Sequence, residues 1–323
     1  MTNEIFTIRT HSEFNVLALK IFRYQYLNNP IYQQYVDFHV KDIASVSSYL
    51  EIPFLPIEFF KTHKVYSENH PIKKIFTSSG TSGENTSKHY IADTSLYKKS
   101  FLSGFNHFYG PPESYIILAL LPSYLEREGS SLVYMAEKLV KLSGNQDSGF
   151  YLNNLPDLAK MLLKTKGQKT ILLGVSFALL DLSLQYELDL PGLIVMETGG
   201  MKGRAKEITR YELHQTICEK LGVPSVHSEY GMTELLSQAY SKGNGVFNTP
   251  PWMKVLIRDI NDPKTLLNNT KSGGINIIDL ANIYSCSFIA TQDLGKLNED
   301  GSFEVLGRFD SSDIRGCNLL INE

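Results

Sequence analysis

The segment Phe76–Lys88 combines three kinds of residue that can bind phosphate. It reads F-T-S-S-G-T-S-G-E-N-T-S-K, so hydroxyl side chains and two glycines stand between an apolar lead-in and a lysine. Glycine lets backbone N–H groups approach an anion, the hydroxyls add donors, and the lysine adds positive charge. The spacing fits neither the G-x-x-x-x-G-K-[ST] phosphate loop nor the G-x-G-x-x-G dinucleotide fingerprint. Taken alone, the segment indicates either a phosphate-binding loop or a Ser/Gly-rich surface loop.

Three polar segments further along the chain carry residues suited to a nucleotide. They are His227–Glu234 (H-S-E-Y-G-M-T-E), Thr291–Gly295 (T-Q-D-L-G) and Gly307–Asp310 (G-R-F-D). In this order after the first segment, they resemble the adenylate-forming superfamily of acyl- and aryl-CoA synthetases and luciferases. The lead-in Ile52–Lys61 (I-P-F-L-P-I-E-F-F-K) and the short C-terminal part narrow this to the LuxE-type acyl-protein synthetases. These are the fatty-acid-activating components of fatty acid reductase systems, and the resemblance covers the chain from about Ile52 onward.

The resemblance implies that the first segment holds the phosphates of ATP. Its candidates are Thr77, Ser78, Ser79, Gly80, Thr81, Ser82, Gly83 and Lys88. Activating a carboxylate with ATP brings two anions together, so the site must neutralise phosphate charge, hold Mg²⁺ and orient the carboxylate for in-line attack. Thr233 would hydrogen-bond a phosphate oxygen or the substrate carboxylate. Glu234 offers the hard oxygen ligand that Mg²⁺ prefers, unless it is a solvated surface glutamate.

The remaining candidates would bind the nucleoside part of ATP. The resemblance implies that Tyr230, with Ser228 and Gly231 in the same segment, serves adenine, although Tyr230 could equally be a buried core residue. It assigns the ribose hydroxyls to Asp293, which could otherwise cap a turn. Arg308 would touch ribose or phosphate through its fork of donors. Glu197, Gly199 and Gly200 follow an expected strand and form either a backbone shelf under adenine and acyl group or an ordinary turn.

The C-terminal part departs from the larger superfamily. Full-length members continue past the Gly-Arg-x-Asp hinge into a domain that carries a catalytic lysine, and we expect both to be missing here, since the last lysine is Lys296. Lys88, Arg308 or Arg315 could replace its charge, a partner could supply it, or activity could be low. In the LuxE-like family a cysteine near the C-terminus receives the acyl group. Cys317, two residues after Arg315, is either this acceptor or a small core residue.

Composition excludes several classes of protein. Apolar residues make up 42% of the 323 residues, charged residues 20%, and the net charge is −3, which describes an ordinary globular chain with no attraction to nucleic acid. No N-terminal signal peptide and no apolar run of membrane-spanning length is present in the sequence, so we expect no membrane insertion. Three separated cysteines, Cys218, Cys286 and Cys317, favour neither disulfides nor a zinc site and fit the cytoplasm.

The expected fold is α/β, that of the N-terminal large domain of adenylate-forming enzymes. Residues 1–70 read as helical, with an apolar stripe after a Ser12 cap. Residues 71–244 form the nucleotide- and acyl-binding core, 245–306 a small β-rich subdomain, and 307–323 a hinge and tail. Within the core, strand-length apolar runs alternate with helical patterns, which predicts a mainly parallel sheet covered by helices. The predicted strands are Tyr115–Leu121, Thr170–Val175, Leu193–Glu197 and Val223–His227.

One motif suggests a different class of enzyme. Gly174–Ala178 (G-V-S-F-A) follows an expected strand and is similar to the G-x-S-x-G nucleophile elbow of hydrolases, with His214 and His227 available downstream. Its last residue is alanine, and a hydrolase would leave the other segments unexplained. We therefore interpret Ser176 as a helix N-cap.

The sequence thus predicts a Mg-ATP-dependent ligase that converts a fatty acid to acyl-AMP and then to a Cys317 thioester, for delivery to a partner such as an acyl reductase. Fatty rather than aryl acid rests on the resemblance alone. The alternatives are an acid-CoA or acid-carrier ligase of the phenylacetate-CoA ligase type, in which Cys317 is structural, and a nucleotide-binding scaffold without turnover.

Overall fold

The computed structural model describes residues 1–78, 86–121, 129–152, 154–199, 208–267 and 271–308. Its internal contacts divide the chain into two compact units. Unit 1 comprises Met1–Ile72, His89–Ala92 and Pro251–Glu323, and unit 2 comprises Lys73–Lys88 and Asp93–Pro250. The four-part division expected from the sequence remains a prediction.

Unit 2 is built on a parallel sheet with strand order β5-β4-β6-β7-β8. Its strands are β4 (Ile116–Leu120), β5 (Gly149–Tyr151), β6 (Thr170–Val175), β7 (Ile194–Thr198) and β8 (Val226–Tyr230). The antiparallel strands β9 (Ala239–Ser241) and β10 (Val246–Asn248) extend the sheet beyond β8. Every residue of β4 and β6 is buried, as expected for strands covered on both faces. The predicted α/β class is therefore confirmed, with a sheet that is mixed.

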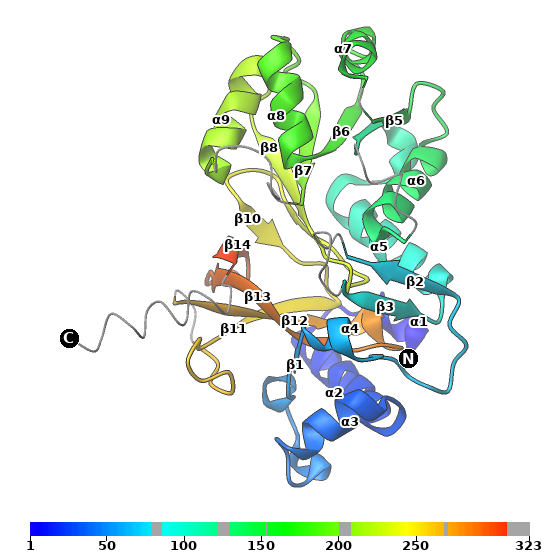
Figure 1. The fold of residues 1–323 in the computed structure, drawn as a ribbon, viewed down its shortest axis with the longest axis vertical. Helices are drawn as coiled ribbons and strands as arrows, with labels where there is room; N and C mark the ends of the chain where they lie inside the picture. The colour runs from blue at the N-terminus through cyan, green and yellow to red at the C-terminus, as the bar shows by residue number, and fades with distance from the viewer. Residues whose placement is uncertain (79–85, 122–128, 153, 200–207, 268–270, 309–323) are drawn as a thin grey trace, which may run out of the picture. The chain divides into compact units, whose positions relative to one another are not determined.

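Helices cover both faces of this sheet. They are α5 (Thr94–Tyr109), α6 (Ser131–Ser143), α7 (Leu155–Lys164), α8 (Ser176–Gln185) and α9 (Arg210–Leu221). In Figure 1, α8 and α9 lie on one side of β6–β8, and α5 and α6 lie on the other. Because the connection from β4 leads outward to β5 while that from β6 leads to β7, the order reverses between β4 and β6. In such sheets ligands bind beyond the carboxyl ends of the strands near this reversal.

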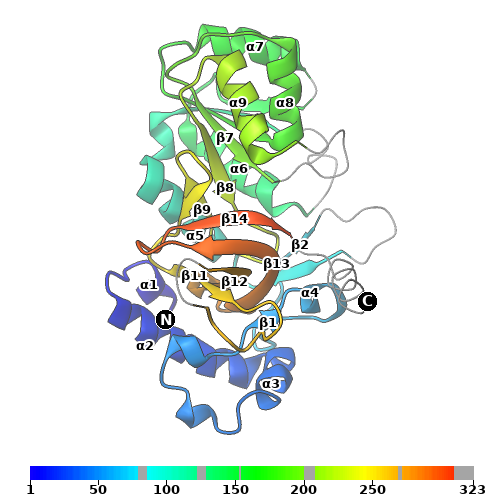
Figure 2. The same cartoon turned by 90° about the vertical axis from the view of Figure 1, so that its left-hand side faces the viewer.

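Unit 1 combines N-terminal helices with an antiparallel sheet of order β11-β12-β13-β14 (Figure 2). The strands are β11 (Met253–Arg258), β12 (Ser272–Asp279), β13 (Phe288–Leu297) and β14 (Phe303–Arg308). The helices are α1 (Thr2–Ile5), α2 (His11–Asn28), α3 (Pro30–Asp37) and α4 (Phe59–Thr62). The short strand β1 (Leu55–Pro56) pairs in parallel with β13. Aromatic rings of Phe22, Tyr32 and Phe288 pack together between the helices and the sheet.

Two local predictions are wrong in detail. The N-cap of α2 is Thr10, whose hydroxyl accepts from the backbone N–H of Glu13 in a capping box, rather than Ser12. Strand β8 runs from Val226 to Tyr230 instead of from Val223 to His227, so Ser228 and Glu229 also belong to the strand. In the described part of the chain, none of the helices is both long and apolar enough to cross a membrane.

Candidate active site

Polar side chains are buried at the carboxyl ends of three neighbouring parallel strands in unit 2. Ser176 follows β6, Glu197 and Thr198 end β7, and Ser228 and Glu229 lie near the end of β8. Each is at most 9% exposed. Burying carboxylates in this way is costly unless they are hydrogen-bonded or protonated. The two glutamates meet this requirement differently.

Glu197 is held by three side chains from three other elements. Ser176 Oγ donates to Glu197 Oε1 at 2.6 Å, His214 Nε2 lies 2.8 Å from Oε2, and Ser228 Oγ donates to Oε2 at 3.4 Å. Burial alone would raise the pKa of Glu197, but the hydrogen bonds from His214 and Ser176 hold it below its ordinary value. The carboxylate is therefore ionised and ties β7 to α8, α9 and β8. Because the Glu197 side chain makes these hydrogen bonds, only its backbone could contribute to the predicted shelf under adenine and acyl group.

This network rules out Ser176 as a hydrolase nucleophile. A nucleophilic serine needs a histidine base in contact with its hydroxyl, and the acid stands behind the histidine. Here the glutamate stands between the other two residues, because Ser176 and His214 contact the two oxygens of the Glu197 carboxylate. The Ser176 hydroxyl hydrogen-bonds the carboxylate and not the histidine. Ser176 is also fully buried. The predicted N-cap role is wrong as well, since Val175 precedes α8 without a side-chain cap.

The pKa of Glu229, one strand away, is shifted in the opposite direction. Thr198 Oγ1 donates to Glu229 Oε2, and burial raises the pKa of Glu229 to about 7. Neighbouring carboxyl groups whose pKa values are pushed apart are a common feature of active sites. Sequence reasoning missed Glu229, because the strand was expected to end at His227 and the residues of β8 (V-H-S-E-Y) are mostly polar.

Gly231 is required because Glu229 turns back over it. A Cβ on Gly231 would lie 2.4 Å from Glu229 Oε1 and 3.3 Å from Gln238 Cγ. The carboxyl group thus packs directly on the backbone of the Tyr230–Glu234 segment. This gives Gly231 a steric reason for being glycine, independent of any nucleotide.

We expect Gly231→Ala to destabilise the chain by about 1–3 kcal/mol, because the methyl group and the buried carboxyl cannot share this space. Gly192→Ala is the matched control, since nothing lies within 4 Å of its Cβ position. Urea unfolding of both variants measures the difference. Equal stabilities would contradict the contact between Glu229 and Gly231. The double variant Glu229→Ala/Gly231→Ala should recover part of the loss.

The other residues of this segment are placed as follows. Glu234 is 5% exposed, so it is not a solvated surface glutamate. Thr233 and Tyr230 are half-buried, and the Tyr230 ring packs on Phe247 with centroids 5.8 Å apart. Tyr230 therefore has a partner in the core and keeps part of its surface exposed. Gly199, directly after β7, is exposed and has φ +75°, which favours glycine.

The two ends of the predicted phosphate loop are joined within unit 2. The Ser78 N–H donates to the Ser87 carbonyl at 3.1 Å, and the Ser87 N–H donates to Ser78 Oγ at 3.0 Å. The Thr77 N–H donates to the Gly129 carbonyl at 2.8 Å, and Lys88 is exposed. Several candidates lie outside the described residues: Ser79, Gly80, Thr81, Ser82, Gly83, Gly200 and Cys317.

Asp293 and Arg308 belong to unit 1, where β13 and β14 bring them together. They are register partners, and Arg308 Nε lies 3.9 Å from Asp293 Oδ1. Asp293 sits within β13, so the alternative of a turn-capping aspartate is wrong. Arg308 is 52% exposed at its side chain and keeps donors available to solvent. The sequence assigned both residues to the nucleotide, and in the structure they lie opposite each other on neighbouring strands.

The cysteines at 218 and 286 are poor candidates for thioester chemistry. Burial raises the pKa of Cys286 to about 12, and burial also raises the pKa of Cys218. A raised pKa keeps the thiol protonated and unreactive.

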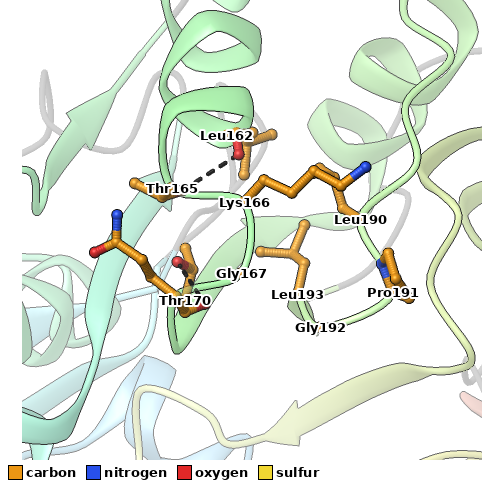
Figure 3. A pocket seen from close by; sticks show the side chains of 10 residues that line it. Leu162, Thr165, Lys166, Gly167, Thr170, Leu190, Pro191, Gly192 and Leu193 are labelled. Carbon is orange, nitrogen blue, oxygen red and sulfur yellow. Dashed lines mark hydrogen bonds between the residues drawn. The ribbon is translucent and has the colours of Figure 1, made fainter.

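A small cavity lies at the opposite end of the parallel sheet (Figure 3). It has a volume of about 130 Å³ and is lined by α7 residues, the turn before β6 and the turn before β7, including Leu162, Lys166, Thr170 and Leu193. None of the predicted site residues lines it. It is therefore separate from the strand ends that carry the buried glutamates.

Comparison with known proteins shows the fold. No protein-family model matches the sequence, and no curated protein matches it. ATP-bound MatB from Rhodopseudomonas palustris superposes with a TM-score of 0.57 at 16% identity, over 83% of this chain and 52% of that one. A 2-hydroxyisobutyryl-CoA ligase in complex with 2-HIB-AMP and CoA gives 0.66 at 12% identity, over 93% and 70%. A long-chain-fatty-acid-CoA ligase from Archaeoglobus fulgidus gives 0.54 at 17% identity, over 79% and 55%.

The chain spans about half the length of the MatB structures it matches. At these identities the likeness concerns the fold, and the fold is the one that the sequence resemblance predicted. This chain has the fold of the matching part of these solved structures.

Proposed function

We propose that this chain activates a carboxylic acid with ATP, forming an acyl-adenylate and pyrophosphate. One observation carries the proposal. The segment Tyr230–Glu234 leaves the carboxyl end of β8, the parallel neighbour of β7, with Glu234 buried, in a fold shared with a solved CoA ligase. The strand ends are where α/β sheets bind ligands.

The reaction is a displacement at phosphorus. A carboxylate oxygen of the acid attacks the α-phosphorus, the bond from that phosphorus to the bridging oxygen breaks, and pyrophosphate leaves. The Thr233 hydroxyl orients the carboxylate or a phosphate oxygen, and Lys88 and Arg308 balance phosphate charge. Asp293 accepts the ribose hydroxyls.

Magnesium fits this donor set through Glu234. The described part of the chain contains no cluster of three or more His, Cys, Asp or Glu able to hold a metal. Mg²⁺ commonly takes one or two carboxylates and completes its shell with water and substrate phosphates. Bound in this way, it would neutralise charge on the phosphates.

The second half of the proposal is acyl transfer to Cys317. Its thiolate attacks the acyl carbonyl carbon, the bond to the phosphate oxygen breaks, and AMP leaves. Arg315 would favour the thiolate. The substrate we propose is a fatty acid, and the next acceptor a partner such as an acyl reductase.

The test is pyrophosphate release with Mg-ATP across fatty acids of graded length and several aryl acids. We expect release that depends on the acid and has an optimum among fatty acids, together with labelled acyl group on the protein. Cys317→Ser should abolish the label and spare pyrophosphate release. If the label persists in Cys317→Ser, Cys317 is not the acceptor. If the wild-type chain takes no label and release requires CoA, the chain is an acid-CoA or carrier ligase. ATP binding without release for any acid indicates a scaffold.

A further inference from the structure

The segment Ile52–Lys61 helped to narrow the resemblance, and the structure gives it a specific contact. Strand β1 pairs in parallel with β13, matching Leu55 with Ile289 and Pro56 with Ala290, and the Ile57 N–H donates to the Ala290 carbonyl at 2.9 Å. Continuing this register by two residues brings Glu58 beside Gln292. Gln292 Nε2 donates to Glu58 Oε1 at 2.7 Å.

Gln292 in turn contacts Arg308. Arg308 Nη2 donates to Gln292 Oε1 at 3.1 Å, so the three side chains form a relay from Glu58 through Gln292 to Arg308. A carboxylate only accepts hydrogen bonds and a guanidinium only donates them. The amide between them can satisfy both in one orientation, with its NH₂ toward Glu58 and its oxygen toward Arg308. Glu58 therefore selects the amide orientation that receives Arg308.

A glutamine in the middle has a consequence for charge. If Glu58 contacted Arg308 directly, the ion pair would neutralise the guanidinium. The amide transmits orientation and leaves the positive charge in place, and the ion pair with Asp293 is long, at 3.9 Å. Because the Arg308 side chain is 52% exposed, it keeps donors for an anion.

A second arginine contacts the strand that carries Gln292, since Arg258 Nη2 donates to the carbonyl of Thr291 in β13 at 2.5 Å. Arg258 is 7% exposed and donates through Nη1 to the Ile275 carbonyl and to Asn276 Oδ1, both at 2.8 Å. Burial lowers the pKa of Arg258, while the nearby carboxylates Glu58 and Asp293 raise it. Glu58 therefore lies near a buried cation, and its link to Arg308 runs through Gln292.

We propose that Glu58 is a positioning residue that, through Gln292, orients Arg308 toward the nucleotide before binding. This rests on the proposed function, which assigns Arg308 to ribose or phosphate. Holding a long side chain in its bound rotamer reduces the entropy lost on binding. Loss of the relay should therefore raise KM for ATP about three- to tenfold and change kcat less.

The kinetic test is a double-mutant cycle. Glu58→Ala and Gln292→Met should raise KM for ATP to a similar extent, and Glu58→Gln, which keeps an acceptor, should restore most of the affinity. In the Arg308→Ala background, Glu58→Ala should have no further effect. An undiminished effect there would overturn the relay. Glu68→Ala, an exposed carboxylate of the same unit, is the charge control.

A second readout does not depend on turnover. In the ligand-free protein, the Nε–H resonance of Arg308, identified as the signal lost in Arg308→Ala, reports its mobility on the fast timescale. Glu58→Ala and Gln292→Met should increase that mobility, and Glu68→Ala should not. Unchanged mobility overturns the relay even if the chain is a ligase. Increased mobility in a chain that releases no pyrophosphate supports the relay and rejects the proposed function.

Discussion

Replacing Glu234 with glutamine should lower acid-dependent pyrophosphate release by at least about 100-fold. The substitution keeps the shape of a side chain that is 5% exposed, so the fold should survive. A neutral amide is a weaker ligand for Mg²⁺ than a carboxylate. Weaker Mg²⁺ binding removes positive charge from the reacting phosphates, where negative charge develops in the transition state. The effect is measured as the initial rate of pyrophosphate release at saturating concentrations of Mg-ATP and of the carboxylic acid substrate.

Two comparisons distinguish a loss of Mg²⁺ binding from a nonspecific loss of activity. Glu219→Gln removes an exposed carboxylate on α9 of the same unit and should leave release unchanged. Raising Mg²⁺ should restore part of the activity of Glu234→Gln and none in a variant damaged elsewhere. Release at the wild-type rate in Glu234→Gln would remove Glu234 from the magnesium site.

Much of the fold could be predicted because its signals are local. The apolar run Thr170–Val175 has the bounds of β6, as both faces of a central parallel strand are buried. Gly222 ends α9 in the left-handed conformation, and a Cβ there would lie 2.9 Å from Asp189 Cα. A helix stop of this kind needs no knowledge of the rest of the chain.

The wrong predictions arise where two local sequence signals compete or where the deciding contact is distant in the sequence. Ser12 and Thr10 are both good caps, and Glu13 decides between them because it completes the capping box with Thr10. Ser176 sits at the start of α8, but its hydroxyl is taken by Glu197, which lies 21 residues away. No local pattern contains that partner.

The candidate site was predicted by motif, and its supporting contacts were not. Glu58 and Gln292 meet only because β1 pairs with β13 in one register. Glu229 is buried only because β8 lies inside the sheet and Thr198 ends the neighbouring strand. Register and strand order are set by the whole chain, so these residues become visible only in the structure.

Glu229→Gln should become more stable than the wild type as pH rises. In the folded chain the pKa of Glu229 is raised to about 7 by burial, from an ordinary value of 4.5. Between these values the folded state binds more protons than the unfolded state, so stability falls with rising pH. The contribution of the protonated carboxyl is complete below about pH 4.5 and is lost as pH rises through about 7. Glutamine does not titrate and keeps a carbonyl that accepts from Thr198.

The stability difference between Glu229→Gln and the wild type should therefore grow by about 2–3 kcal/mol from pH 5 to pH 8. Urea unfolding at each pH measures it. His227, whose pKa burial lowers, titrates in both proteins and cancels in the difference. Glu219→Gln removes an exposed carboxylate, and its free energy of unfolding should depend on pH as that of the wild type does. Parallel profiles for Glu229→Gln would mean that Glu229 is already ionised at pH 5. The group packed on Gly231 would then be a fixed negative charge and could not exchange a proton near neutral pH.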